Sequence, residues 1–137
     1  MGARTKARKR ALDVLYGADV RGESINTVLA AESMRAAEDT KRASSWDYAR
    51  TIVTGVTEHG DEIDELIETY AQGWTIPRMP AIDRALLRIG IWEILYNDEV
   101  PDSVAIAEAV ESARVHSTDD SAGFVNGLLG RIAATRA

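Results

Sequence analysis

The chain has 137 residues, a length typical of one domain, and 45% of them are hydrophobic, which is ordinary for a globular protein and too many for a disordered one. It contains no cysteine, so disulfide frameworks, cysteine-based zinc sites and cysteine nucleophiles are excluded. The longest segment without a formal charge, residues 121–130, is far shorter than the about 20 apolar residues that span a bilayer. We therefore expect a single domain over residues 1–137 of a cytoplasmic protein with no membrane partner.

The net charge of −6 is distributed unevenly along the chain. Residues 11–137 hold eleven basic residues against all 22 acidic ones, while five bases lie within the first ten positions. These five residues, which form a basic N-terminal arm over residues 1–10, are Arg4, Lys6, Arg8, Lys9 and Arg10. A basic arm on an acidic body favours a nucleic-acid contact at one end, with the arm side chains on phosphates. A disordered, solubilising tail is the alternative.

Apolar residues recur at spacings of three and four along the chain, which predicts an all-α protein. The basic arm runs into a first helix that ends near Gly22, and Ser24 is in position to cap a second helix. Residues 35–45 lack large apolar side chains and are expected to form a loop or a frayed helix end. A third helix follows, and Gly60 separates it from a fourth helix with an acidic outer face.

The second half of the chain predicts three further helices. Residues 73–80 form a turn-rich connector, and residues 82–95 are apolar on nearly every side, which is typical of a buried central helix. A sixth helix begins after Pro101 and a seventh near residues 118–120. Gly123, Gly127 and Gly130 form a stripe on the seventh helix where another helix can approach closely. The expected fold is a compact bundle of about seven helices.

Motifs of catalysis and of cofactor binding are missing from the sequence. The two histidines, His59 and His116, lie far apart, and there is no P-loop, nucleophile elbow or dinucleotide fingerprint. Carboxylates are plentiful, but Asp119 and Asp120 at a helix start are best explained by their interaction with exposed backbone amides. We expect no enzymatic activity, no metal and no cofactor.

Four segments together resemble the NusB family of bacterial transcription antitermination factors. They are the arm leading into residues 8–16, residues 82–95 with the sequence IDRALLRIGIWEIL, residues 100–110, and residues 117–129, where STDDS precedes GFVNGLL. Their order and spacing match the family from end to end, and the combination of the second and fourth segments is the most specific. The resemblance implies two helical bundles that share a core.

The resemblance also implies a function. NusB-like proteins bind the boxA element of nascent RNA, notably in ribosomal RNA leaders, as a heterodimer with NusE, a ribosomal small-subunit protein. The pair joins RNA polymerase and other Nus factors and suppresses premature termination. The expectation is therefore a boxA-binding antitermination factor. The alternative is a helical protein-interaction module that binds no RNA and recruits a basic partner through its acidic faces.

Four residues beyond the arm complete the candidate RNA site. Tyr16 lies one turn past the arm and is placed either to contact a base or to join the core. Asp83 and Asp120 match positions that contact RNA in the family, where a carboxylate can accept hydrogen bonds from base amino groups; a capping or first-turn acid is the alternative. Phe124 sits about 100° from the buried stripe of the seventh helix, as a lid over the core or as a stacking surface.

Overall fold

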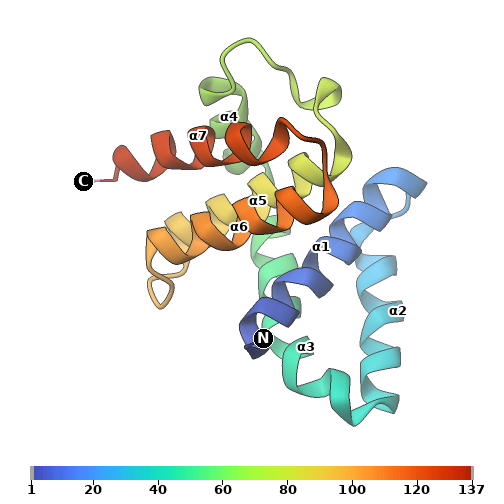
Figure 1. Ribbon diagram of the computed structural model, residues 1–137. Helices are drawn as coiled ribbons and strands as arrows, with labels where there is room; N and C mark the ends of the chain where they lie inside the picture. The colour runs from blue at the N-terminus through green and yellow to red at the C-terminus, as the bar shows by residue number, and fades with distance from the viewer. Residues whose placement is uncertain (1, 137) are drawn as a thin grey trace.

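The computed structural model describes residues 2–136, except for the side chains at positions 40–42 and 44. Seven α-helices and one short 3₁₀ helix make up this part of the chain, which contains no strand (Figure 1). They are α1 (Ala3–Arg21), α2 (Ile25–Glu38), α3 (Thr40–Glu58), α4 (Gly60–Tyr70), η1 (Ile76–Arg78), α5 (Ala81–Tyr96), α6 (Asp102–His116) and α7 (Ser121–Ala134). The predicted all-α architecture is confirmed.

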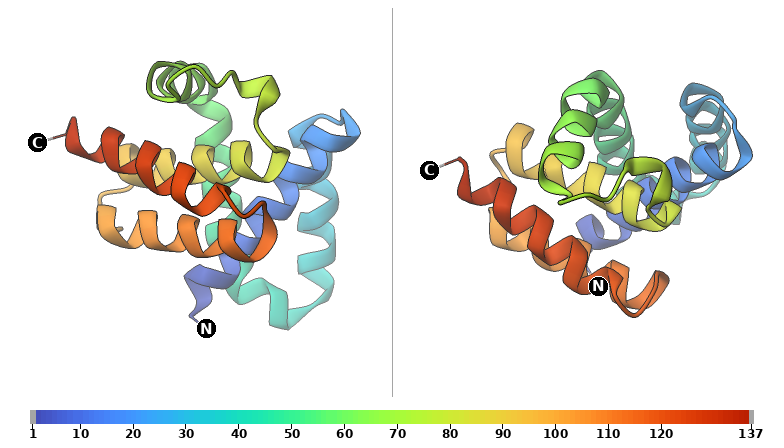
Figure 2. Two further views of the ribbon diagram at one scale, coloured as in Figure 1. Left: turned by 45° about the horizontal axis from the view of Figure 1, so that its top comes forward. Right: turned by 90° about the horizontal axis from the view of Figure 1, so that it is seen from above.

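The helices form two groups that meet at α5. Helices α1, α2 and α3 pack on one another, and α4, α6 and α7 surround α5 in the second group. Seen from above, α1 and α2 lie on one side of the molecule and α6 and α7 on the other (Figure 2). Because α5 also contacts α1 and α3, one continuous core joins the two groups.

Helix α5 is central because apolar side chains cover most of its circumference. Leu87, Ile91 and Ile94 are completely buried, and ten of its sixteen residues are shielded from solvent. The inward positions expected on α7 are also confirmed. These buried residues are Val125, Leu128, Leu129 and Ile132. A helix that is buried on most sides, as α5 is, is stabilised by packing on several neighbouring helices rather than by its own helix propensity.

Helix ends follow local signals with one exception. Helix α1 ends at Gly22, whose φ of 66° lies in the left-handed region, and the Glu23 N–H donates to the Ala18 carbonyl at 3.0 Å. Helix α4 begins at Gly60, as the sequence predicts. Ser24 stands at the N-cap position of α2, but its side chain makes no capping hydrogen bond.

Residues 35–45, for which a loop or a frayed helix end is expected, are helical in the structure except at Asp39. Helix α2 continues to Glu38 and α3 starts at Thr40, so only Asp39 interrupts the two helices. The segment is rich in alanine and in long polar side chains, which are good helix formers without large apolar groups. Ala36 is buried, which shows that a small side chain suffices for packing at this corner.

The glycine stripe on α7 also differs from expectation. An added Cβ would meet nothing within 4 Å at Gly123 or Gly130, whereas at Gly90 of α5 it would lie 2.7 Å from the Leu129 side chain. The close approaches in the described residues are therefore at other glycines. The tightest is Gly55 of α3, where an added Cβ would lie 1.9 Å from the Trp92 indole nitrogen.

Gly55→Ala is expected to destabilise the protein. Alanine is the better helix former by about 1 kcal/mol, but its methyl group would overlap the buried Trp92 ring, and overpacking of this kind costs about 1–3 kcal/mol. Gly130→Ala is the matched control, because its site is open and helix propensity alone should act there. Urea denaturation of both variants measures the difference. Equal midpoints would contradict the close packing of α3 on Trp92.

Candidate nucleic-acid interface

The basic arm is the first part of a helix. Helix α1 begins at Ala3, and both Ala7 and Ala11 are completely buried against the rest of the protein. The basic side chains of residues 4–10 therefore project from a rigid element. For this segment the alternative of a disordered tail is wrong, because the apolar face of α1 anchors it.

Arg8 differs from the other arm residues because its guanidinium is buried. Its Nε lies 2.9 and 3.0 Å from the two carboxylate oxygens of Glu93, and its Nη1 lies 3.4 Å from Oε1 of Glu108. Arg8 shares the buried face of α1 with Leu12 and Leu15, four and seven residues later. The structure thus corrects the expectation for Arg8, whose charge is engaged inside the protein rather than offered to phosphate.

Tyr48 of α3 completes this buried cluster. Its hydroxyl donates to Glu93 Oε2 at 2.6 Å and accepts from Asn97 Nδ2 at 3.0 Å. Burial and the hydrogen bond to Glu93 raise the pKa of the Tyr48 phenol well above its ordinary value. Burial alone would lower the pKa of Arg8, but the hydrogen bond and charge of Glu93 outweigh it, and the net shift is upward. The cluster ties α1, α3 and α5 together.

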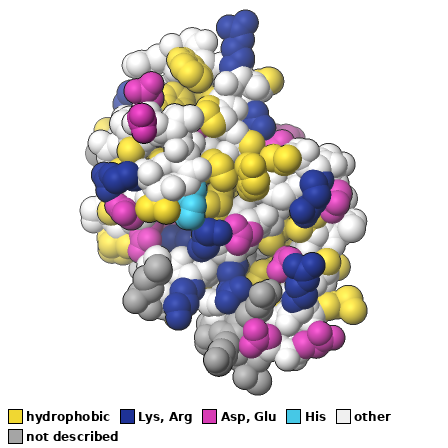
Figure 3. All heavy atoms as spheres, turned by 45° about the vertical axis from the view of Figure 1, so that its right-hand side comes forward, with side chains coloured by type: hydrophobic (Ala, Val, Ile, Leu, Met, Phe, Trp, Pro, Cys, Tyr) yellow, Lys and Arg dark blue, Asp and Glu magenta, His cyan; other side chains and the backbone are white. Residues whose placement is uncertain are grey.

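The other four arm cations are at or near the surface. Arg4 pairs with Glu99 at 3.1 Å and Lys9 with Asp13 at 2.6 Å, both in exposed ion pairs that contribute little to stability. Arg10 donates from Nε to the Ser45 hydroxyl at 2.6 Å, and Lys6 has no acidic partner within residues 2–136. Lys and Arg side chains gather across this side of the molecule, with acids interspersed (Figure 3). These four cations can therefore reach phosphate groups.

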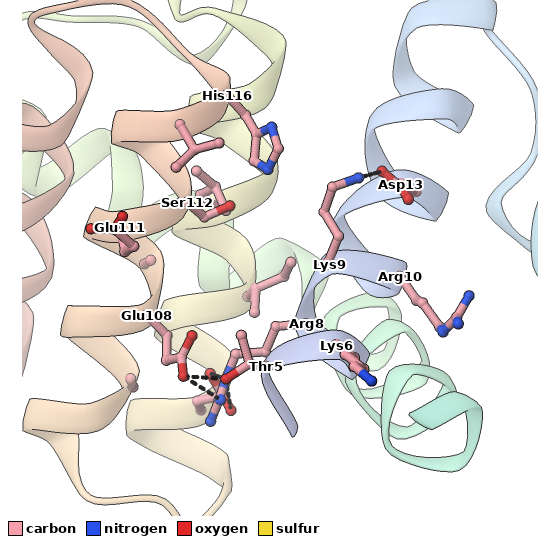
Figure 4. Close-up of a pocket in the computed structure, with 16 residues that line it drawn as sticks. Thr5, Lys6, Arg8, Lys9, Arg10, Asp13, Glu108, Glu111, Ser112 and His116 are labelled. Atoms are coloured by element: carbon pink, nitrogen blue, oxygen red, sulfur yellow. Dashed lines mark hydrogen bonds and ion pairs between the residues drawn. The ribbon is translucent and has the colours of Figure 1, made fainter. Parts of the chain in front are cut away.

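A groove of about 550 Å³ runs between α1 and α6, with α5 as its floor. Thr5, Lys9 and Asp13 line it from α1, and Glu108, Ser112 and His116 line it from α6 (Figure 4). Lys9 points along the groove towards Asp13, whereas Arg10 points away from it, towards α3. Lys6, Lys9 and Arg10 of α1 line one wall of the groove, and Glu108 and Glu111 of α6 line the other.

The groove leads from the basic end of α1 to the turn between α6 and α7. Lys9, Asp13 and Tyr16 follow at spacings of four and three, so they share one face of α1. On the opposite side, His116 is the last residue of α6, directly before the turn that leads into α7. Tyr16 is 37% exposed, whereas its neighbour Leu15 is buried. Tyr16 is therefore a surface residue rather than part of the core.

Asp83 does not reach the surface that RNA could contact. It is 2% exposed in the first turn of α5, where its Oδ1 accepts from the Ser117 hydroxyl at 2.5 Å and its Oδ2 from the Ser121 hydroxyl at 2.8 Å. Asp83 thus corrects the sequence-based expectation of a direct contact. Its carboxylate is directed into the turn between α6 and α7, and it holds the start of α7 in place.

Asp120 and Phe124 remain accessible at the start of α7. Asp120 occupies the N-cap position and is exposed, and its side chain makes no capping hydrogen bond. Phe124 is half-buried one turn later, at the shoulder of the buried stripe as predicted. A carboxylate without a capping bond beside an aromatic ring is available for contact with a ligand.

Trp74 is the residue that sequence reasoning missed. Its ring centroid lies 5.8 Å from that of Phe124, and it comes from the connector between α4 and η1, fifty residues away in sequence. A tryptophan in a Gly- and Pro-containing connector has no helical periodicity to predict its surroundings. Its place beside Phe124 follows only from how the connector folds back onto α7.

The described residues contain no group of three side chains that could hold a metal ion together. None of the helices in residues 2–136 has the length and apolar character needed to cross a bilayer. The candidate nucleic-acid interface consists of exposed cations, the exposed Asp120 carboxylate and accessible aromatic rings.

Known proteins match the chain along its length. The NusB family model covers residues 5–134. The transcription antitermination protein NusB of Leifsonia xyli subsp. xyli is 66% identical, over 99% of this chain and 94% of that protein, and the NusB of Clavibacter sepedonicus is 66% identical over the full length of both. A crystal structure of antitermination factors NusB and NusE in complex with dsRNA contains a chain with a TM-score of 0.83 at 26% identity, over 97% of each chain.

Two helical groups that share α5, with a cationic helix end and accessible aromatic rings, define an all-helical protein with a surface suited to nucleic acid. The match to the family model over residues 5–134 and the identity to the curated relatives are decisive. The chain belongs to the NusB family.

Proposed function

We propose that this protein is a cytoplasmic transcription antitermination factor, without enzymatic activity, that binds boxA RNA of nascent ribosomal transcripts together with NusE. In this role it acts with RNA polymerase and the other Nus factors to prevent premature termination. The entire chain over residues 1–137 acts as one RNA-binding domain. The observation that carries the proposal is the groove between the cationic end of α1 and α6, which reaches His116, directly before the turn that leads to the exposed Asp120.

The two ends of this surface have different tasks in the proposal. Arg4, Lys6, Lys9 and Arg10 contact phosphates, which supply affinity and depend on salt but do not distinguish sequences. Tyr16, Asp120 and Phe124 contact bases, because aromatic rings stack on unpaired bases and a carboxylate accepts from base amino groups. The buried Asp83 and Arg8 do not contact RNA in this proposal. Asp83 positions the start of α7, and Arg8 positions α1.

A single-stranded target fits this arrangement better than a duplex. Stacking on Phe124 requires a base whose face is free, which an unpaired strand offers and a base-paired stem does not. The acidic body of the protein, with 22 acids and eleven bases in residues 11–137, repels RNA away from the basic arm and suits a basic protein such as NusE.

Electrophoretic shifts with boxA-like and scrambled single-stranded RNA, each with and without NusE, test the proposal. Wild-type protein should prefer boxA-like RNA, and NusE should raise the affinity. Phe124→Ala should weaken binding by the amount of one stacked base, about 1–3 kcal/mol. Asp120→Asn should reduce the preference for boxA without unfolding the protein, because Asp120 makes no capping bond that the change would remove.

Leu128→Ala is the matched control on the same helix, one turn beyond Phe124. Leu128 is completely buried, so this change should lower the free energy of unfolding by about 2–5 kcal/mol and leave RNA binding of the folded protein intact. Phe124→Ala should destabilise clearly less, because its ring is only half-buried. Equal binding of both RNAs, or none, combined with tight NusE binding would instead favour a protein-interaction module.

A further inference from the structure

Trp74 is unusual among the three tryptophans because its ring is largely in solvent. It is 53% exposed, whereas Trp46 and Trp92 are 7% and 6% exposed in the core. An exposed indole leaves a large apolar surface in contact with water. Exposed apolar surface of this kind is often found where another molecule binds.

The backbone before Trp74 is held in an uncommon conformation. Gln72 has a φ of 54° and Gly73 a φ of 95°, so two successive residues lie in the left-handed region, and Gln72 is the non-glycine residue with positive φ in residues 2–136. The Trp74 N–H donates to the Ala71 carbonyl at 3.3 Å, which closes the turn. Such local strain persists where the surrounding structure fixes it, and it is frequent at binding sites.

The connector is fastened to α7 next to this turn. Arg131 of α7 donates from Nη2 to the Tyr70 carbonyl at 2.9 Å, directly before the connector begins. Phe124 and Arg131 lie seven residues apart and so share one face of α7. The connector therefore crosses this face of α7, and the Trp74 ring lies against Phe124 rather than moving freely in solvent.

The two rings form an open pair rather than a closed stack. Their centroids are 5.8 Å apart and their planes meet at 37°, so the outer face of Trp74 stays accessible. Arg78 of η1 follows four residues later, is exposed, and has no acidic partner within the described residues. A nucleotide carries a base, which can stack on a free aromatic face, and a phosphate, which an unpaired cation can contact. The Trp74 ring and Arg78, which is near it in sequence, offer these two groups.

We propose that Trp74 is a second base-stacking residue of this protein, which extends the Phe124 surface so that two neighbouring bases of a single RNA strand stack on the ring pair. The inference rests on the proposed function and adds a residue to its site. One indole and one phenyl ring are too small for a protein interface, which buries about 800 Å² on each partner. A base needs only one ring face.

Trp74 also provides its own spectroscopic signal. Because Trp46 and Trp92 are buried, quenching of tryptophan fluorescence by acrylamide reports mainly on Trp74. Saturating boxA-like RNA should protect the wild-type protein from acrylamide. The Trp74→Phe variant should show little quenching with or without RNA, which assigns the signal to this ring.

Affinity measurements on three variants complete the test. Trp74→Ala should weaken binding of boxA-like RNA by about 5- to 150-fold, the range for loss of one stacked base, and Trp74→Phe should retain most of the affinity. Met34→Ala, which truncates an even more exposed apolar side chain on α2, should leave the RNA affinity unchanged. Binding of NusE without RNA should be the same for all variants.

The outcomes separate this inference from the proposed function. Loss of RNA affinity in Phe124→Ala but not in Trp74→Ala, or no protection of Trp74 by RNA, overturns the role of Trp74 alone. Loss of NusE binding in Trp74→Ala with unchanged RNA affinity would show a protein contact and also overturn it. Failure of the wild-type protein to bind boxA-like RNA, with or without NusE, would overturn both proposals.

Discussion

Replacing Glu93 with Gln is expected to lower the free energy of unfolding by about 3–5 kcal/mol, the usual cost of removing one partner from a buried ion pair. Glu93 is 1% exposed and accepts both close contacts from Arg8. Without the Glu93 charge, the Arg8 guanidinium keeps only the ion pair with Glu108 at 3.4 Å, and a buried cation is left largely uncompensated. This loss is a large part of the about 5–15 kcal/mol that stabilises a typical domain.

Glu99→Gln is the matched control, because Glu99 also pairs with an arginine of α1. The Arg4–Glu99 pair is exposed, with 47% and 78% of the two side chains accessible, so its loss should change stability by less than about 1 kcal/mol. The double variant Arg8→Met with Glu93→Gln removes both charges and should be more stable than Glu93→Gln alone. Denaturant unfolding of the three variants at one pH measures these differences in the free energy of unfolding. Equal effects of Glu93→Gln and Glu99→Gln would contradict a buried cluster.

Replacing the four accessible arm cations with glutamine is expected to produce the largest loss of RNA binding. Each phosphate contact on single-stranded RNA contributes about 0.7 to the slope of log affinity against log salt. The variant that changes Arg4, Lys6, Lys9 and Arg10 should therefore lose about 2.8 from the slope, and about two to three orders of magnitude in affinity at 0.1 M salt. Titrations at several salt concentrations measure both quantities.

Point substitutions test the arm better than its removal. Deleting residues 1–10 would also remove Ala7 and Arg8, which are buried, and would leave the Glu93 carboxylate without its cationic partner. A variant with Arg35→Gln and Arg114→Gln is a suitable control, because both residues belong to exposed ion pairs within single helices. The control should leave the slope unchanged. A slope that falls equally in both variants would mean that overall charge acts, rather than specific contacts of the arm.

The positions of the helices could be predicted from the sequence because helical periodicity is local. The apolar spacing identified α5 as the buried centre and the inward face of α7, and the structure confirms both. Prediction from the sequence failed where large apolar residues are absent, as at residues 35–45, because an alanine-rich helix can pack without the large apolar residues that reveal helical periodicity. It also failed for the glycines, since a close approach depends on which side chain faces the glycine, as Trp92 faces Gly55.

For the site, the sequence by itself determined which residue types are available and the family to which the chain belongs. It located the four accessible arm cations, the exposed Tyr16 and Asp120, and the half-buried Phe124. Burial and pairing were decided only by the tertiary structure. Arg8 and Asp83 look like surface charges in sequence, but Glu93 and the two serines of the α6–α7 turn lie at least 34 positions away. Trp74 joins Phe124 for the same reason: contacts between residues distant in sequence depend on how the helices pack, and periodicity along one helix carries no information about its neighbours.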